Sequence, residues 1–511
     1  MEPVPDWGTV PRMVLEQAAR HPDVPVLDGV TYAGLLERAL AVAGDLLALG
    51  IERGDRVAVW GLNDAAWVVR AVGVWLAGAV IVPLSARFKA LEAADVLART
   101  GAKALLAADG FTPPDGFPHL LTADGSAHLR TPEGSARLRT PRPVRRSHRA
   151  AVLERAGAVE PTDLCEIMST SGTTGTPKGV MLDHAQVLRG YWDWAEIVGL
   201  RAEDRYPVIA PFAHGFGLNA GLLACLLRRA AMIPVPVFRP ELIIDLLESR
   251  KITVLAGPPT LFHRLLDELD RAPHDFSSLR VAICGAAVVP PELVRRLLDR
   301  TGLERMINAY GLMEGTVVSM TRAEDPVEVV AGTAGRPVPG IEVKVVDPAG
   351  HALPAGERGE ILQRGYGVMR GYWDDPVRTA EVIDADGWLH TGDVGYLDPS
   401  GNVVLVDRLK ELYIVNGFNV SPAEVEALLL REGSLAQVAV VGVPDARSGE
   451  AGWAFAVPRP GQEVDAAAVL GWARRHLSSH KVPKHLTVVE ELPLNATGKV
   501  DKQALRRLTA S

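Results

Sequence analysis

The sequence is poor in cysteine and has no uninterrupted hydrophobic run of membrane-spanning character. Its three cysteines, Cys165, Cys225 and Cys284, lie far apart among 511 residues, so neither a disulfide framework nor a cysteine-based zinc site is expected. The uncharged run 71–86 is shorter than the ~20 residues of a typical membrane span. The run 206–227 is longer, but prolines and glycines interrupt it, and we expect buried strand and helix there rather than a membrane span.

An excess of positive charge is also missing. The chain carries 54 lysines and arginines against 62 acidic residues, a net charge of −8, which argues against binding nucleic acid or an anionic membrane as the main task. The first residues are acidic and proline-bearing and lack the pattern of a signal peptide, so we expect a cytoplasmic protein. The length exceeds what one core normally holds, which predicts at least two domains.

What is present is an alternation of short apolar runs and helical patterns through the first 300 residues. It predicts parallel sheet with crossover helices. After Gly332, short strands with close turns predict antiparallel sheet, and a small α+β pattern follows Leu409. The segment 111–149 is rich in proline, glycine and arginine, and we interpret it as a solvated surface insertion. A basic docking loop is the alternative.

The strongest local signal is the stretch STSGTTGTPKG at 169–179. Glycines let the backbone turn its N–H groups toward an anion, while the hydroxyls and Lys178 add donors and positive charge. Predicted strands at 164–168 and 180–181 flank the stretch as a hairpin, which favours a phosphate-binding loop over a flexible linker. Because Pro177 precedes the lysine and Gly179 follows it, this is not the P-loop of ATPases. Zinc-protease and α/β-hydrolase motifs do not occur either.

At this loop the sequence resembles the adenylate-forming superfamily of acyl-CoA synthetases, peptide-synthetase adenylation domains and luciferases. The resemblance covers nearly the whole chain, and it rests on seven motifs in the family's order. After the loop these are PFAHGFG at 211–217, NAYGLMEG at 308–315, WLHTGDV at 388–394, DRLKEL at 407–412, GFNVSPAE at 417–424 and NATGK at 495–499.

The resemblance implies a fold and a reaction. The fold is an α/β protein whose large N-terminal domain, 1–409, has stacked αβα-type sheets plus a small β-barrel-like part, followed by a small mobile α+β C-terminal domain at 410–511. In the reaction, a carboxylate attacks the α-phosphorus of ATP to give an acyl-adenylate and pyrophosphate, and a thiol then displaces AMP. The implied cofactors are ATP, Mg²⁺ and coenzyme A, the implied partner is a small-molecule acid, and the expected state is a monomer or homodimer.

The resemblance also assigns residues. Lys499 would lie between the acyl carboxylate and the α-phosphate, Glu314 and Thr174 would bind Mg²⁺, and these three with His214 are the predicted catalytic residues. Tyr310 would stack on adenine, and Lys410 would be the hinge of the mobile domain. The complete set predicted to bind the nucleotide is Thr170, Ser171, Gly172, Thr173, Thr174, Gly175, Lys178, Gly285, Ala286, Ala287, Asn308, Tyr310, Gly311, Asp393, Arg408 and Lys410.

The acid pocket is predicted from the same motifs. His214 would flank it, with Trp192, Phe212, Phe216 and Met313 as walls. Met313 stands where the family has a threonine that donates to the α-phosphate, and methionine cannot donate. Slower adenylation or an unusual nucleophile is therefore expected. Each of these side chains also has a purely structural explanation, and the shared order of the motifs is what favours the functional one.

Three functions compete at this point. The first is an ATP- and Mg²⁺-dependent acid–CoA ligase, similar to actinobacterial acyl-CoA ligases that include enzymes for bulky ring-bearing acids. The second keeps adenylation without coenzyme A and passes the activated group to an amine or carrier protein, including nitrite activation for diazotisation of an aryl amine. The third is a silent nucleotide-binding protein, against which the presence of Glu314, Asp393 and Lys499 argues.

Overall fold

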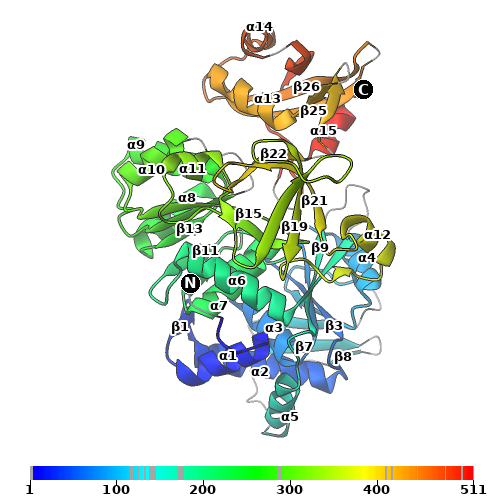
Figure 1. Cartoon of the computed structure of the whole chain (residues 1–511). Coiled ribbons are helices and arrows are strands. Elements are labelled where there is room, and N and C mark those ends of the chain that lie inside the picture. Colours follow the sequence, from blue (N-terminus) through cyan, green and yellow to red (C-terminus); the bar gives the residue numbers. More distant parts are fainter. Residues whose placement is uncertain are drawn as a thin grey trace. The chain divides into compact units, whose positions relative to one another are not determined.

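The computed structural model describes residues 4–509 except 115–116, 118, 124–125, 132–133, 137–145, 171–177, 286–288, 290, 409–410, 416–417, 446, 478 and 496–498. For 119–123, 126–131, 134–136, 146–147, 260, 407–408 and 418–419 it describes no side chains. The chain divides into two compact units (Figure 1). The first comprises Met1–Val343 and Gln363–Leu389, and the second comprises Lys344–Leu362 and His390–Ser511.

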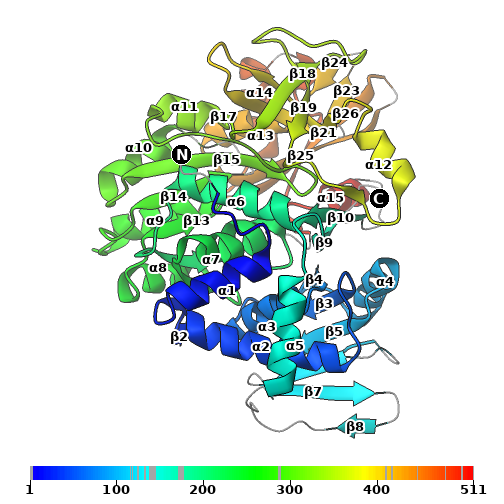
Figure 2. The ribbon, with the colours of Figure 1, turned by 60° about the horizontal axis from the view of Figure 1, so that its bottom comes forward.

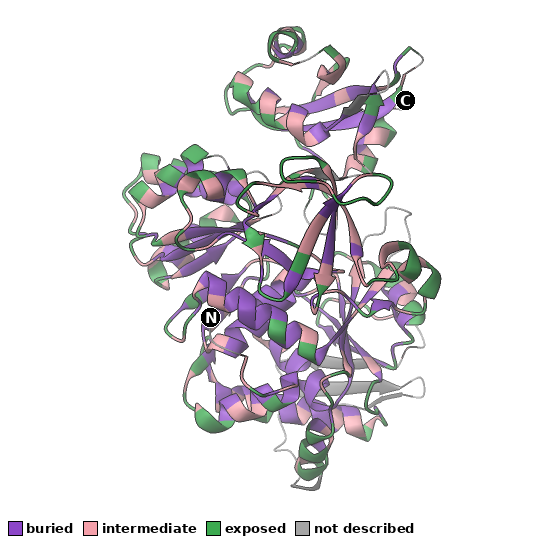
Figure 3. Cartoon of the chain, in the orientation of Figure 1, coloured by how far each residue is buried: buried purple, intermediate pink, exposed green. Residues whose placement is uncertain are grey.

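The first unit is built on a nine-stranded sheet in the order β20-β10-β9-β4-β3-β5-β6-β7-β8. The first three of these strands are β20 (Gly371–Tyr372), β10 (Lys178–Asp183) and β9 (Leu164–Thr170). Its centre is parallel, as the sequence predicts: β3 (Arg56–Trp60) lies between β4 (Val80–Leu84) and β5 (Ala104–Ala108). The crossover helices are α3 (Ala65–Leu76) and α4 (Ala90–Thr100). Buried residues fill these central strands (Figure 3), the pattern of a parallel sheet covered on both faces.

The segment 111–149 extends one end of this sheet with three strands that the sequence analysis did not foresee. They are β6 (His119–Ala123), β7 (Ser126–Thr131) and β8 (Gly134–Ala136), the first parallel to β5 and the next two antiparallel to their neighbours (Figure 2). Helix α5 (Arg146–Gly157) follows. Whether the segment is a solvated insertion or a docking loop stays a prediction.

A second sheet of the first unit has the order β13-β14-β15-β16-β17. The strands β13 (Val254–Ala256), β14 (Val281–Gly285) and β15 (Arg305–Leu312) are parallel, and β16 (Thr316–Met320) and β17 (Arg336–Pro337) are antiparallel. The helices of this region are α8 (Pro240–Ser249), α9 (Pro259–Arg271), α10 (Pro291–Arg300) and α11 (Val327–Gly332). Their apolar faces form a separate core with the sheet.

A third sheet, β11-β12-β1-β2, joins the chain's beginning to its middle. Its strands are β11 (Arg205–Val208), β12 (Ala231–Pro234), β1 (Pro25–Leu27) and β2 (Val30–Thr31). Around it lie α1 (Val10–Arg20), α2 (Tyr32–Ala48), α6 (His184–Val198), the π-helix η1 (Phe216–Leu223) and α7 (Ala224–Arg228). The uncharged run 206–227 is thus buried strand and helix, as predicted. Among the described residues, no helix is long and apolar enough to cross a membrane.

A four-stranded sheet, β18-β19-β21-β22, lies mostly in the second unit and supplies the predicted antiparallel part. Its strands are β18 (Ile341–Val346), β19 (Gly359–Gly365), β21 (Leu389–Leu397) and β22 (Val403–Arg408). The α+β pattern after residue 409 is also confirmed: β23 (Tyr413–Val415), β24 (Phe418–Val420), α13 (Pro422–Leu429), β25 (Leu435–Asp445), β26 (Gly449–Pro458), α14 (Ala466–His476), β27 (His485–Val488) and α15 (Lys502–Leu508). The α/β fold class is confirmed, whereas the domain boundary at 410 stays a prediction.

Candidate active site

The two ends of the predicted phosphate loop lie opposite each other on a hairpin. Thr170 ends β9 (Leu164–Thr170), Lys178 begins β10 (Lys178–Asp183), and the two are partners in an antiparallel pair. The sequence-predicted hairpin is therefore confirmed. The loop itself, 171–177, lies outside the described residues, and with it the predicted Ser171, Gly172, Thr173, Thr174 and Gly175, whose roles stay predictions.

One tyrosine links Lys178 to Glu314, the predicted metal ligand. The ammonium nitrogen of Lys178 lies 4.4 Å from the ring centroid of Tyr372, within cation–π range. The hydroxyl of Tyr372 donates to Oε1 of Glu314 at 3.0 Å. Burial, and then the neighbouring carboxylate, raise the pKa of Tyr372, so its hydroxyl keeps the proton that it donates. A cation and an anion expected to contact one triphosphate therefore share one aromatic side chain.

The backbone fixes the place of this tyrosine. Tyr372 lies on β20 (Gly371–Tyr372), which pairs antiparallel with β10 and sets Tyr372 opposite Val180. Just before it, the N–H of Met369 donates to the carbonyl oxygen of Glu314 at 2.8 Å. The segment 369–372 thus contacts both the hairpin of the phosphate loop and the turn that carries Glu314.

Three of the predicted adenine-site residues lie on neighbouring parallel strands. Gly285 ends β14 beside Ala309 of β15, and Tyr310 and Gly311 follow on β15. A Cβ on Gly285 would lie 2.7 Å from the carbonyl oxygen of Ala309, so only glycine fits there. Tyr310 is 7% exposed. The carboxyl ends of parallel strands are where open α/β sheets bind ligands, which agrees with the predicted position of the nucleotide.

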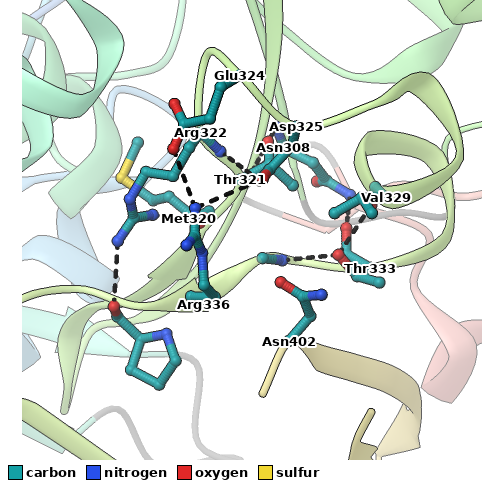
Figure 4. A network of polar contacts seen from close by, with 12 residues as sticks. Asn308, Met320, Thr321, Arg322, Glu324, Asp325, Val329, Thr333, Arg336 and Asn402 are labelled. Carbon is teal, nitrogen blue, oxygen red and sulfur yellow. Dashed lines mark hydrogen bonds and ion pairs between the residues drawn. The ribbon is translucent and has the colours of Figure 1, made fainter. Parts of the chain in front are cut away.

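Asn308, also predicted to bind the nucleotide, has a buried side chain that contacts backbone. Its Nδ2 donates to the carbonyl oxygen of Thr333 at 2.8 Å (Figure 4). It also donates to the carbonyl oxygen of Val330 at 3.3 Å. Its own N–H donates to Oγ1 of Thr321 at 2.9 Å. These bonds tie β15 to the end of α11. A contact between Asn308 and the nucleotide stays a prediction.

A buried asparagine holds the loop that carries His214. Nδ2 of Asn63 donates to the carbonyl oxygens of Val208 at 3.1 Å and Ala210 at 2.8 Å, and its Oδ1 accepts from the N–H of Phe212 at 2.8 Å. After His214 the chain turns back on itself. A Cβ on Gly217 would lie 2.2 Å from the carbonyl oxygen of Pro211, so only glycine fits there. Asn63 and this glycine therefore determine the path of the loop.

Met313 contacts the same loop. The N–H of Gly215 donates to Sδ of Met313 at 3.4 Å, and a Cβ on Gly215 would lie 2.9 Å from that sulfur. The side chain that replaces the family's threonine is therefore packed against the backbone next to His214. The structure thus places Met313 against Gly215, the residue that follows His214 in the chain. The acid pocket itself stays a prediction.

The three aromatic residues predicted as pocket walls have different surroundings. Phe212 and Trp192 are buried, 1% and 6% exposed, whereas Phe216 is only partly buried. Each has an aromatic neighbour. The ring centroid of Phe212 lies 4.8 Å from that of Trp67, that of Trp192 lies 5.6 Å from that of Trp7, and that of Phe216 lies 6.3 Å from that of Trp194. Phe216 directly precedes Gly217 in the turn of the loop, while the other two pack in the core. All three wall assignments stay predictions.

A buried polar pair connects the loop's helix to the strand of the phosphate loop. Nδ2 of Asn219, on η1, donates to Oε1 of Glu166 on β9 at 2.8 Å. Both residues are almost wholly buried, and Oε2 of Glu166 has no partner among the described residues. Burial raises the pKa of Glu166 to about 7, against a smaller lowering by the bond from Asn219. π-Helices such as η1 are rare and are frequently found at functional sites.

In the second unit, Asp393 and Arg408 are partners across β21 and β22. Asp393 is buried, and the turn before it is held by Glu360 of β19. The carboxylate of Glu360 accepts from the N–H of Gly392 at 3.1 Å and lies 2.9 Å from Nδ1 of His390. Gly392 has a φ of +69°, which favours glycine. The TGD sequence thus has a defined backbone, although the side chain of Arg408 lies outside the described atoms.

Lys499 ends a turn near the chain's terminus. The carbonyl oxygen of Lys499 accepts from the N–H of Asn495 at 2.7 Å, and its own N–H donates to Oδ1 of Asn495 at 3.0 Å. Its side chain is exposed. Residues 496–498 inside this turn, and the predicted site residues Ala286, Ala287 and Lys410, lie outside the described residues, so their roles stay predictions.

The residues that hold the predicted ones in place have no motif of their own in the sequence. They are Asn63, Glu166, Glu360 and Tyr372. Glu166 carries a usable signal, because it is one charge inside the otherwise apolar run 164–168. For the others the signal is weak, because each acts through a bond to a residue far away in the sequence.

Comparison with known proteins gives the family. The family model described as AMP-binding enzyme matches residues 14–373, and that of the AMP-binding enzyme C-terminal domain matches 424–499. The chain is 42% identical to a 3-[(3aS,4S,7aS)-7a-methyl-1,5-dioxo-octahydro-1H-inden-4-yl]propanoyl:CoA ligase of Mycobacterium tuberculosis, over 98% of this chain and 99% of the relative. It is 36% identical to a feruloyl-CoA synthase of an Amycolatopsis species, over 94% of each.

A solved structure agrees over the same length. ATP-bound MatB from Rhodopseudomonas palustris is similar to this chain with a TM-score of 0.82 and 28% identity, over 98% of each chain. These findings confirm the predicted fold, the use of ATP and the enzyme class, an AMP-forming acid–CoA ligase. The chain belongs to the AMP-binding enzyme family.

Proposed function

We propose that this enzyme converts a bulky, ring-bearing organic acid into its adenylate and then into its coenzyme A thioester. The choice of acid rests on the two relatives, one named for a bicyclic propanoate and one for ferulate. The observation that carries the chemistry is the contact of Tyr372 with both Lys178 and Glu314. A metal-bound triphosphate needs a cation near its phosphates and a carboxylate for its metal ion. Lys178 and Glu314 offer these two groups, and both contact Tyr372.

Magnesium fits the residues present. Mg²⁺ usually takes one or two protein carboxylates and completes its shell with phosphate oxygens and water. Glu314 offers such a hard oxygen ligand, and no group of three or more His, Cys, Asp or Glu side chains suited to a metal occurs in the described part of the chain. Glu314 and Thr174 would hold the ion, which would neutralise charge on the phosphates.

In the first half-reaction, an oxygen of the acid's carboxylate bonds to the α-phosphorus of ATP while the bond to pyrophosphate breaks. Lys178 would offset negative charge on the leaving phosphates. Lys499 would offset charge between the two reacting anions, and Asp393 would hold the ribose through its two acceptor oxygens. His214 and Met313 would border the acid.

In the second half-reaction, the thiol loses its proton and its sulfur bonds to the acyl carbon, while the bond from that carbon to the phosphate oxygen breaks and AMP leaves. Lys499 must give way for the thiol to approach, so we propose that the C-terminal domain turns about Lys410 between the two halves. Coenzyme A is the proposed acceptor, since both relatives are named for CoA thioester formation.

The proposal is tested by incubating the protein with ATP, Mg²⁺ and a panel of acids, each with and without coenzyme A. The panel contains ferulate, a bicyclic diketo-propanoate, benzoate, malonate and medium-chain fatty acids. AMP and thioester formed together, with a ring-bearing acid preferred, are the expected result. Equal turnover of malonate or fatty acids would refute the proposed acid. AMP released without thioester, on addition of an amine or nitrite, would refute coenzyme A as the acceptor.

A further inference from the structure

The turn that carries Glu314 has an unfavourable backbone. It connects β15 to β16, is closed by a bond of 3.2 Å from the N–H of Gly315 to the carbonyl oxygen of Leu312, and ends at Thr316. The φ of Thr316 is +54°, a left-handed conformation that a β-branched residue rarely adopts. Such outliers persist only where the surrounding structure enforces them, and they cluster at functional sites.

A wholly buried glutamine enforces this turn. Gln363 lies on β19 with 0% exposure, and its Nε2 donates to the carbonyl oxygen of Gly315 at 2.7 Å. Oε1 of Gln363 and Oγ1 of the buried Thr316 both lack a hydrogen-bond partner within the described residues. A buried amide with one acceptor unused is costly. An apolar side chain of similar size would pack at this position without that cost.

The packing around the turn leaves no room for adjustment. A Cβ on Gly315 would lie 2.1 Å from Oε1 of Gln363. One on Gly367 would lie 2.6 Å from Oγ1 of Thr316 and 2.9 Å from the carbonyl oxygen of Gly315. Gln363, Thr316 and these two glycines therefore form one close-fitting support beneath the turn.

Glu314 and its neighbour Gly315 accept hydrogen bonds from three donors. The carbonyl oxygen of Glu314 accepts from Met369 and its carboxylate accepts from Tyr372, while Gln363 holds the next residue, Gly315. All three donors come from the segment 363–372, so one stretch of chain fixes both the backbone and the carboxylate of Glu314. A metal ligand held in advance does not have to be ordered when the ion binds.

We propose that Gln363 and the strained Thr316 are positioning residues that hold Glu314 ready for the metal–nucleotide complex. The inference rests on the proposed role of Glu314. Neither side chain touches the substrate in this account. Their contribution is the affinity that Mg²⁺ adds to ATP binding, because a loosened turn would let the carboxylate leave its place.

The test measures ATP binding by calorimetry without any acid, so that no turnover occurs, once with Mg²⁺ and once with a chelator. Gln363→Met removes the donor to Gly315 at similar volume. Mg²⁺ should increase the ATP affinity of this variant about tenfold less than it does for wild type, because about one hydrogen bond is lost. The affinity for ATP without metal should stay within about twofold of wild type. Thr316→Gly, which removes the backbone strain, is expected to reduce the same gain without lowering the melting temperature.

The matched control is Gln17→Met, since Gln17 is also buried and donates to a backbone carbonyl, that of Leu227 at 3.1 Å, away from the turn. It should lower stability and leave the effect of Mg²⁺ unchanged. An unchanged effect of Mg²⁺ in both Gln363→Met and Thr316→Gly overturns the inference. Glu314→Gln distinguishes failure of the proposed metal ligand from failure of its positioning residues. If this variant also leaves the effect of Mg²⁺ unchanged, the proposed role of Glu314 fails, and the inference about Gln363 and Thr316 fails with it.

Discussion

The hydroxyl of Tyr372 donates a hydrogen bond of 3.0 Å to Oε1 of Glu314 while its ring lies under the ammonium group of Lys178. Tyr372→Phe removes the first contact and keeps the second. Because a hydrogen bond to a charged group contributes about 1.5–3 kcal/mol, we expect kcat/KM for Mg·ATP to fall by about ten- to a hundredfold. Steady-state kinetics at saturating acid measures this.

The chain offers a matched control in Tyr366, whose hydroxyl donates to Oδ2 of Asp193 at 2.9 Å. Tyr366→Phe removes an equivalent tyrosine–carboxylate bond that does not involve the predicted metal ligand. It should affect stability more than kinetics. Equal losses of kcat/KM in the two variants would contradict the role given to Tyr372.

Asn63 is expected to control binding of the acid rather than of ATP. Asn63→Leu leaves the carbonyl groups of Val208 and Ala210 and the N–H of Phe212 without their partner, and each unsatisfied buried group costs about 1–3 kcal/mol. The KM for the acid should rise about tenfold or more, with the affinity for ATP nearly unchanged. The control is Asn402→Leu, since Asn402 is also buried and its side chain bonds to Asp398. This variant should lower stability without raising the KM for the acid selectively. Parallel losses for acid and ATP would argue against the prediction.

Glu166 should make stability depend on pH. Its pKa is raised by burial from an ordinary 4.5 to about 7, so the folded chain binds this proton more tightly than the unfolded chain. The resulting stabilisation is present below about pH 4.5 and is lost as the pH rises through about 7, a difference of roughly 3 kcal/mol. Glu166→Gln keeps an acceptor for Asn219 and cannot ionise.

Melting temperatures of wild type and Glu166→Gln, measured at about pH 5 and about pH 8.5, test this linkage. The variant should gain stability relative to wild type at the higher pH. Glu203→Gln, at a side chain that is 78% exposed, should show no such gain. A constant difference between wild type and Glu166→Gln at both pH values would contradict the prediction.

Lys499 should act in only one half-reaction. Lys499→Ala removes the ammonium group and keeps the two hydrogen bonds between residues 495 and 499, which use backbone and asparagine atoms. Acyl-adenylate formation from acid and ATP should fall by more than about a hundredfold, the order expected for one charge-stabilising group. Thioester formation from supplied acyl-adenylate should stay near wild type. Equal loss of both would refute the role of Lys499.

The sequence predicted the elements that have local signals. The hairpin at Thr170 and Lys178, the parallel strands and the antiparallel sheet after Gly332 follow from periodicity and turn residues, and the ordered motifs identified the family. It did not predict the contact of Tyr372 with Glu314, because 58 residues separate the two and neither has a neighbour that suggests pairing. Nor did it predict the π-helix at 216–223, since the sequence of its eight residues is equally compatible with an α-helix.

Long-range support of the site was the part least accessible from sequence. Asn63 and Gln363 look like ordinary polar residues, and only the folded chain brings them to Phe212 and Gly315. By contrast, Gly285 and Gly215 lie inside recognised stretches, and the structure explains them by close contacts with Ala309 and Met313.

The most direct test of the central claim follows the oxygen atoms of the acid. With an active acid labelled in its carboxylate by heavy oxygen, attack on the α-phosphorus leaves one labelled oxygen in the AMP that thioester formation releases. We predict label in AMP and none in pyrophosphate, with one labelled oxygen retained in the thioester. Label in inorganic phosphate, or AMP without label, would contradict activation through an adenylate.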